Sequence, residues 1–193
     1  MEASSQMSVD REPVLVGRSF GVLWVLASIV GWALGSVVSD TLGDVVGQVW
    51  FDSVGLIVLG ASIGGMQWLV LRRQVSWAGW WVVANIAGWT VGALVNLPLN
   101  LPLGLFPGWL VGLLVAGVFQ WLVLRRHIYR ATWWLLVSFA GFVTGSGISV
   151  AIPGCLGPCS AAVLGAVLGA MTGIALAWLL RQPAPPSVEA DKA

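Results

Sequence analysis

The sequence predicts an all-α membrane protein: a six-transmembrane-helix bundle built from three tandem helical-hairpin repeats in a pseudo-threefold arrangement. The first observation is composition, because 58% of the 193 residues are hydrophobic and only 9% are charged, whereas charged residues make up about a quarter of a soluble domain. The second is length, since the polar breaks leave six apolar segments of the roughly 20 residues that a helix needs to cross a bilayer. The third is repetition, because the segment QWLVLRR occurs twice.

The six apolar segments mark the expected transmembrane helices. They cover residues 19–39, 53–71, 77–97, 104–124, 131–152 and 160–180. Their apolar residues are continuous and do not alternate with a period of two, as the strands of an outer-membrane barrel do. The first segment is too long for a signal-peptide core and no cleavage pattern follows it, so we expect it to stay in the mature protein. A cytoplasmic tail at 1–18 and a flexible, proline-rich cytoplasmic tail at 181–193 flank the transmembrane domain at 19–180.

Positive charges near helix ends stay preferentially in the cytoplasm, so their positions predict topology. The cations precede the odd-numbered segments or follow the even-numbered ones: Arg11, Arg18, Arg72, Arg73, Arg125, Arg126, Arg130, Arg181 and Lys192. The opposite connections contain no cation, and the first of them carries Asp40, Asp44 and Asp52. We therefore expect a multi-pass protein of the bacterial plasma (inner) membrane, with both termini in the cytoplasm.

Tryptophan is concentrated toward the same side. Its apolar ring and polar N–H favour the boundary between lipid headgroups and hydrocarbon. The tryptophans within about two turns of an expected cytoplasmic helix end are Trp24, Trp68, Trp77, Trp80, Trp81, Trp121, Trp133, Trp134 and Trp178. We expect them to form an interfacial belt, with a stacking platform for a pigment or quinone as the alternative.

The three odd-numbered segments align residue by residue, which is the signature of an internal repeat. WVLASIVGWALG, WVVANIAGWTVG and WLLVSFAGFVTG begin at Trp24, Trp81 and Trp134. Each continues at fixed spacing with a small polar residue, a glycine, an aromatic residue and a second glycine. Together with the even-numbered segments they predict hairpin repeats at 19–71, 77–124 and 131–180.

The even-numbered segments carry the motif QWLVLRR. It begins at Gln67 and returns 53 positions later at Gln120, whereas a degenerate third copy, GIALAWLLRQ at 173–182, has lost the glutamine. The paired arginines are expected to anchor each returning hairpin at the cytoplasmic face. In this motif the chain resembles a group of uncharacterised multi-pass bacterial membrane proteins built from tandem hairpins of this type. The resemblance covers most of the chain and implies a topology but no activity.

Glycines four residues apart occur in every expected helix: Gly31/Gly35, Gly60/Gly64, Gly88/Gly92, Gly108/Gly112, Gly141/Gly145 and Gly165/Gly169. Small residues at this spacing let helix backbones approach closely, and such packing drives helix association in lipid. The three aligned pairs of the odd-numbered segments are expected to bring those three helices close to one another.

A column of polar residues runs through the aligned segments. Ser28, Asn85 and Ser138 lie on the glycine-bearing face of their helices and are expected to point into the bundle, away from lipid. One interpretation makes them interhelical hydrogen-bond partners worth about 1 kcal/mol each. The other makes them the lining of a solute path or of a headgroup site. Gln67 and Gln120 have the same two interpretations.

The two cysteines, Cys155 and Cys159, lie in the connection IPGCLGPCS on the expected outer side, where thiols can be oxidised. The intervening Gly-Pro turn allows a small structural disulfide, and two free thiols are the alternative. The other outer connections are also distinctive. Residues 40–52 are expected to form a short interfacial helix, and the proline-rich 96–108 segment is not expected to be helical throughout.

Function is constrained by what the spans lack. No ionisable residue lies between the expected helix ends, although proton-driven transporters and many membrane enzymes place such residues there. The single histidine, His127, falls in a cytoplasmic loop and cannot by itself form a metal site or a proton relay. We therefore expect a non-enzymatic integral membrane protein of the lipid bilayer, with no cofactor, no metal and no nucleic-acid partner. It would be a scaffold or accessory subunit that packs with itself or with another membrane protein; the alternative is a channel or facilitator for a small neutral solute.

Overall fold

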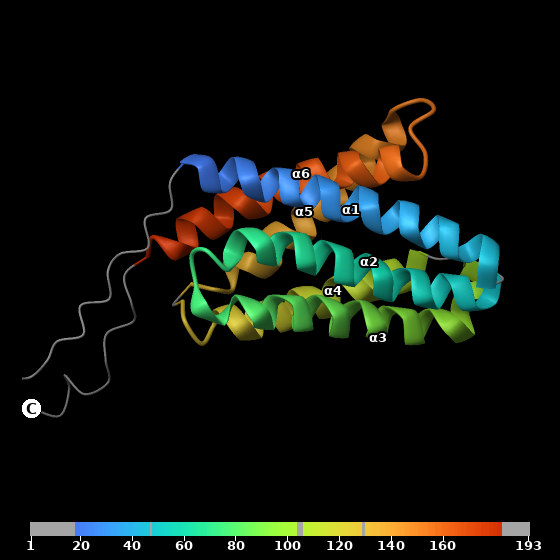
Figure 1. Ribbon diagram of the computed structural model, residues 1–193, viewed down its shortest axis with the longest axis horizontal. Helices are drawn as coiled ribbons and strands as arrows, with labels where there is room; N and C mark the ends of the chain where they lie inside the picture. Colours follow the sequence, from blue (N-terminus) through green and yellow to red (C-terminus); the bar gives the residue numbers. More distant parts are fainter. Residues whose placement is uncertain (1–17, 47, 104–105, 129, 183–193) are drawn as a thin grey trace, which may run out of the picture.

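The computed structural model describes residues 18–46, 48–103, 106–128 and 130–182, which are helical with short connections (Figure 1). Its helices are α1 (Arg18–Val46), α2 (Gln48–Leu71), α3 (Gly79–Leu103), α4 (Phe106–Leu124), α5 (Trp133–Ala151) and α6 (Pro158–Leu180), with a 3-10 turn, η1 (Ser76–Ala78), before α3. The described residues contain no strand. The expected all-α class is therefore confirmed.

Five of the helices are long and apolar enough to cross a membrane. Their apolar stretches are Ser19–Leu42, Val54–Leu71, Ser76–Val95, Trp133–Ala151 and Pro158–Leu180. The described apolar stretch of α4, Gly108–Leu124, is shorter. At 1.5 Å per residue it is about 25 Å long, somewhat less than the roughly 30 Å of a bilayer core. These helices are consistent with a multi-pass membrane protein.

Two helix boundaries differ from expectation. The helix expected within residues 40–52 is not separate, because α1 continues to Val46 and α2 begins at Gln48. In the proline-rich segment, α3 continues to Leu103 and so includes Pro98 and Pro102. Proline removes a backbone donor and kinks a helix, but helices in lipid tolerate it, because leaving a whole stretch of backbone without hydrogen bonds would cost more.

The helices lie side by side with alternating direction, so each connection lies at one of two ends. We call the end that carries Arg72, Arg125 and Arg181 the arginine end, and the end that carries Cys155 the cysteine end; in Figure 1 the arginine end is at the left. Around the bundle, α1 packs against α2 and α6, α3 packs against α2 and α4, and α5 packs against α6. Only α4 and α5, although consecutive in the chain, have few contacts with each other.

Close helix approach depends on the glycines, but not in the expected direction. A Cβ on Gly31 would lie 2.9 Å from the Cα of Ile63 on α2, and a Cβ on Gly141 would lie 2.9 Å from a methyl carbon of Leu168 on α6. Gly88 likewise faces the backbone of Ala116 on α4. The expectation that these glycines bring the three odd-numbered helices together is therefore wrong. Each pair instead faces the next helix along the chain, against which its own helix packs closely.

The buried core consists of two aromatic layers. The layer nearer the arginine end contains Trp24, Trp81 and Trp134, and the other contains Trp32, Trp89 and Phe142. On each odd-numbered helix the two aromatic residues are eight positions apart, and the polar residue lies midway between them, one turn from each. The polar column is therefore held between the two layers.

Candidate functional site

Three tryptophan N–H groups each donate a hydrogen bond to a polar side chain on a neighbouring helix. Trp81 Nε1 donates to Gln67 Oε1 (2.9 Å), Trp134 Nε1 donates to Gln120 Oε1 (3.0 Å) and Trp24 Nε1 donates to Thr172 Oγ1 (3.1 Å). In every case the donor is on an odd-numbered helix. The donor on α3 binds an acceptor on α2, the donor on α5 binds one on α4, and the donor on α1 binds one on α6. These bonds therefore link each hairpin to another hairpin.

The three donor tryptophans are buried at the centre of the bundle. Trp24 and Trp81 have no exposed surface and Trp134 is 2% exposed. Their rings meet edge to face, with centroids 5.8 Å apart for Trp24 and Trp81 and 5.1 Å apart for Trp81 and Trp134. The expectation that these three belong to an interfacial belt is wrong, because their N–H groups find acceptors inside the protein. The other six keep at least part of their surface exposed: Trp68, Trp77, Trp80, Trp121, Trp133 and Trp178.

The QWLVLRR motif divides its residues between the core and the surface. Each glutamine accepts a bond from a tryptophan of the following hairpin. The leucine four positions later, Leu71 or Leu124, is fully buried. On the neighbouring face, Arg72 lies over the Trp68 ring at 4.7 Å, and the second copy repeats this contact at 4.8 Å. Such cation–π contacts let the apolar part of the arginine stay with the hydrocarbon while its charge reaches water.

Gln67 connects three helices. Its Oε1 accepts from Trp81 on α3, and its Nε2 donates to Ser28 Oγ on α1 at 3.2 Å. Both glutamine and serine are buried. For Ser28 the structure thus provides an interhelical hydrogen bond, as the structural interpretation of the polar column requires.

Asn85 does not follow that interpretation. Its Nδ2 donates to the carbonyl oxygen of Trp81, one turn earlier on the same helix, at 2.9 Å. The interpretation of Asn85 as an interhelical hydrogen-bond partner has no support in the bonds of the described residues. Its tertiary role is packing, because a Cβ on Gly64 of α2 would lie 2.9 Å from the Asn85 Cβ.

The remaining polar residue of the column, Ser138, faces a small cavity. Its Oγ and the Nε1 of Trp32 are the buried side-chain polar atoms of the described residues that lack a hydrogen-bond partner. Both residues line a central cavity of about 40 Å³, together with Gln67, Asn85, Gln120 and Thr172. A volume of this size holds a few water molecules. Ser28 does not line it, so the cavity does not follow the whole polar column.

Thr172 is the functional-site residue that the sequence analysis missed. It is buried and accepts the Trp24 bond where the third repeat lacks a glutamine. Its hydroxyl is also within 2.6 Å of the Leu168 carbonyl oxygen, to which it donates. A signal was present in the sequence: Thr172 follows Gly165 by seven positions, as Gln67 follows Gly60.

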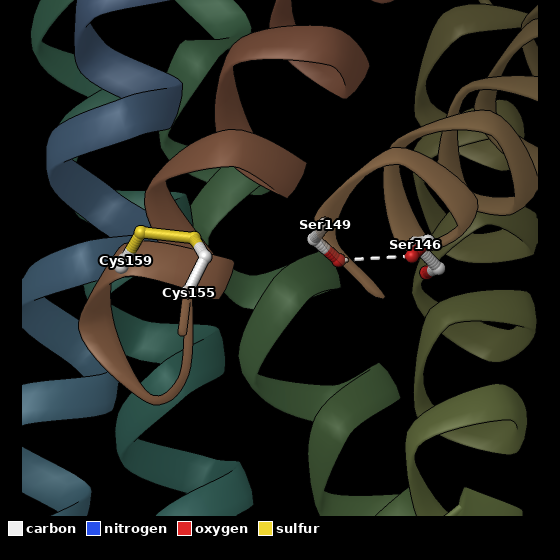
Figure 2. Close-up of a disulfide and its surroundings, with 4 residues drawn as sticks. All are labelled: Ser146, Ser149, Cys155 and Cys159. Atoms are coloured by element: carbon white, nitrogen blue, oxygen red, sulfur yellow. Dashed lines mark hydrogen bonds between the residues drawn. A yellow bond between two sulfur atoms is a disulfide. The ribbon is translucent and has the colours of Figure 1, made fainter. Parts of the chain in front are cut away.

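The cysteine end carries a covalent link. Cys155 and Cys159 form a disulfide, which closes the turn between α5 and α6 (Figure 2). Gly154 and Gly157 in this turn have φ values of 75° and 53°, which glycine adopts without steric cost. The described residues contain no group of three histidine, cysteine or acidic side chains that could hold a metal ion.

Comparisons with protein-family models, with curated proteins and with solved structures find no match to this chain.

Proposed function

We propose that the chain is three helical hairpins, α1–α2, α3–α4 and α5–α6, arranged with pseudo-threefold symmetry about the tryptophan layers. The close packing within each hairpin supports this arrangement. The tryptophan bonds support it further, because each runs from the first helix of one hairpin to the second helix of another. The bond from Trp24 to Thr172 completes the circle between the chain's first and last helices.

The proposed orientation places the arginine end in the cytoplasm of a bacterial cell, with six spans across the plasma membrane. The exposed arginines at that end support it. The test is labelling with a membrane-impermeant thiol reagent in a chain whose native cysteines are replaced by serine. Intact cells should label Pro153→Cys and leave Gln74→Cys unlabelled, and the reverse pattern would exclude this orientation.

We propose that the protein works as a non-enzymatic scaffold or accessory subunit that receives a transmembrane helix of another membrane protein. The observation that carries this proposal is the open seam between α4 and α5, in a bundle whose other neighbouring helices pack closely. We define the seam by Leu113, Leu114 and Gly117 on α4 and by Leu135 and Phe139 on α5. A Cβ on Gly117 would reach only Leu135 across it, at 3.7 Å.

One residue accounts for the seam. Leu113 precedes Gln120 by seven positions, and at that spacing Gly60 precedes Gln67 and Gly165 precedes Thr172. A Cβ on Gly60 would lie 2.6 Å from the Trp89 ring of α3, and one on Gly165 would lie 2.8 Å from the Ser28 carbonyl oxygen of α1. Both glycines are thus required where two hairpins meet closely. The third position has a leucine, Leu113, in place of glycine, and we infer that this larger side chain keeps α4 and α5 from packing as closely.

The seam is apolar on both sides. Leu114 on α4 and Phe139 on α5 are each more than 40% exposed. Phe139 lies one turn after Leu135 on the same face of α5. In lipid, helices associate through close packing, and the exposed Leu114 and Phe139 side chains offer a partner helix an apolar surface for such packing. These features suit a partner helix that takes the place of a closer contact between α4 and α5.

A photo-crosslinking residue at Phe139, in native membranes, tests the proposal. We expect a crosslink to one defined protein, and none from the matched position Leu34, an exposed leucine on α1. Replacing Leu113 by glycine should let α4 and α5 close, shorten the distance between spin labels at Val118 and Val143, and abolish the crosslink. Crosslinks to lipid alone from Phe139, or a crosslink that survives closure, would exclude the partner.

A second candidate function, a facilitator for a small neutral solute, is favoured by the unpartnered Ser138 hydroxyl and Trp32 N–H in the central cavity. Against it, the aromatic layers lie on both sides of the cavity. Flux of small neutral solutes into liposomes distinguishes the two functions. Flux that Ser138→Leu abolishes in a folded protein would favour the facilitator over the scaffold.

A further inference from the structure

A groove runs along α1 and α6, which are not the helices of the seam. Its volume is about 700 Å³. Gly21 and Val25 line it from α1, and Ala170, Ile174 and Trp178 line it from α6. Gly21 leaves open space, because a Cβ built there would meet no atom within 4 Å. Ile174 and Trp178 stand beside this space and are themselves 75% and 41% exposed.

The lining has one charged residue, and it lies at one end. Arg181 follows the last turn of α6 at the arginine end and is exposed. The other lining residues are apolar. The groove therefore combines a hydrocarbon-like wall with a single guanidinium group at the end where lipid headgroups would lie.

The length of the groove matches one leaflet of a membrane. On α6 the lining covers eleven steps of helix from Ala170 to Arg181, or about 16 Å at 1.5 Å per residue, and on α1 it covers five steps from Gly21 to Leu26. Half of a bilayer core of about 30 Å is about 15 Å. The lining stops at Leu26 and Ala170, although α1 and α6 both continue toward the cysteine end. A partner helix would need contact through both leaflets, whereas an acyl chain needs only one.

We propose that this groove binds one acyl chain of an anionic glycerophospholipid, with the lipid phosphate beside the Arg181 guanidinium. Guanidinium groups bind phosphate oxygens through paired, charge-assisted hydrogen bonds. Trp178 lies at the depth where indole rings favour the headgroup boundary. The site is separate from the seam, so a lipid here and a partner helix there do not compete.

The test counts lipids on the full chain by native mass spectrometry, after titration in mild detergent with phosphatidylglycerol or with phosphatidylcholine. The wild type should retain phosphatidylglycerol with about tenfold higher affinity than phosphatidylcholine, a difference of about 1.4 kcal/mol. Arg181→Gln should remove this preference. Arg73→Gln, which removes another exposed arginine of the arginine end, is the matched control and should keep the preference. Gly21→Leu should fill the groove and lower the affinity for both lipids about tenfold. Gly65→Leu is the matched control, because a Cβ at Gly65 also meets open space.

Several outcomes would overturn the proposal. Equal affinity of the wild type for both lipids would exclude the role of Arg181. Unchanged binding by a Gly21→Leu protein that keeps the wild-type helical content would exclude the groove. A dimer that Gly21→Leu converts to a monomer would show that a second copy, not a lipid, occupies the groove. Failure of the seam crosslink would leave these lipid measurements unaffected, so the two proposals fail separately.

Discussion

Trp24 on α1 donates its indole N–H to the hydroxyl of Thr172 on α6, across 148 positions of the chain. Both side chains are buried, and Trp24 belongs to the tryptophan layer nearer the arginine end. Next to it, Gly173 lets α6 approach closely, because a Cβ there would lie 2.9 Å from the Trp24 ring. This contact holds the first and last helices together.

Replacing Thr172 by valine should therefore destabilise the protein by about 1 kcal/mol, because valine has the same shape but leaves the buried indole N–H without an acceptor. Thr172→Ser keeps the hydroxyl and should recover most of that loss. Reversible unfolding in mixed detergent micelles measures both. If Thr172→Val were as stable as the wild type, the bond would not contribute to closing the bundle.

Gln67→Leu should cost more than Gln120→Leu. Gln67 accepts from Trp81 and also donates to Ser28, so its loss leaves two buried partners unsatisfied. The difference should be about 1 kcal/mol in the free energy of unfolding. The two glutamines occupy matched places in the QWLVLRR motif, and each variant is thus a control for the other. Equal losses would show that the Ser28 bond adds no stability.

Ser138→Ala should leave the free energy of unfolding within about 0.5 kcal/mol, because an alanine removes a buried hydroxyl that has no protein partner. Ser28→Ala should cost about 1 kcal/mol, since Ser28 accepts from Gln67. The same unfolding assay compares the two. A loss at Ser138 as large as that at Ser28 would mean that bound water or solute in the cavity bonds the Ser138 hydroxyl.

Arg72→Gln should destabilise the protein by about 0.5–1 kcal/mol through loss of its contact with the Trp68 ring. Arg73→Gln removes the same charge from the next position and should have a smaller effect. A double-mutant cycle with Trp68→Leu measures the contact itself. A coupling energy of zero between Arg72 and Trp68 would contradict the prediction and leave topology as the sole role of the arginine pair.

The sequence correctly indicated the interior position of some polar residues but not their pairings. The spacing of Ser28, Asn85 and Ser138 placed them inside the bundle, and all three are buried. Which atom bonds which depends on helix rotation and depth to within an ångström or so, and a helix with apolar residues on every side does not reveal its rotation. Asn85 was consequently assigned an interhelical bond, whereas it bonds its own helix.

For the tryptophans, too, the sequence does not reveal which side of the helix turns toward the core. Trp80 and Trp81 are adjacent in the chain and equally close to a helix end, yet one is 61% exposed and the other is fully buried. Hydropathy cannot separate them, because the boundary of the membrane and the centre of this bundle both offer an apolar surface with a hydrogen-bond acceptor nearby. In the structure Trp81 turns inward, where Gln67 on the neighbouring helix accepts its N–H and the rings of Trp24 and Trp134 pack against it.

The sequence by itself determined the all-α class and the membrane character, because these depend on composition and on the length of apolar segments, which are local properties. Only the tertiary structure decided that Thr172 accepts the Trp24 bond, and that α4 and α5 lie apart where α2 and α3 are close. The physical reason is that lipid and protein interior are almost equally apolar. The choice between them follows from contacts as small as that of Gly60 with the Trp89 ring, and such contacts exist only once the helices are assembled.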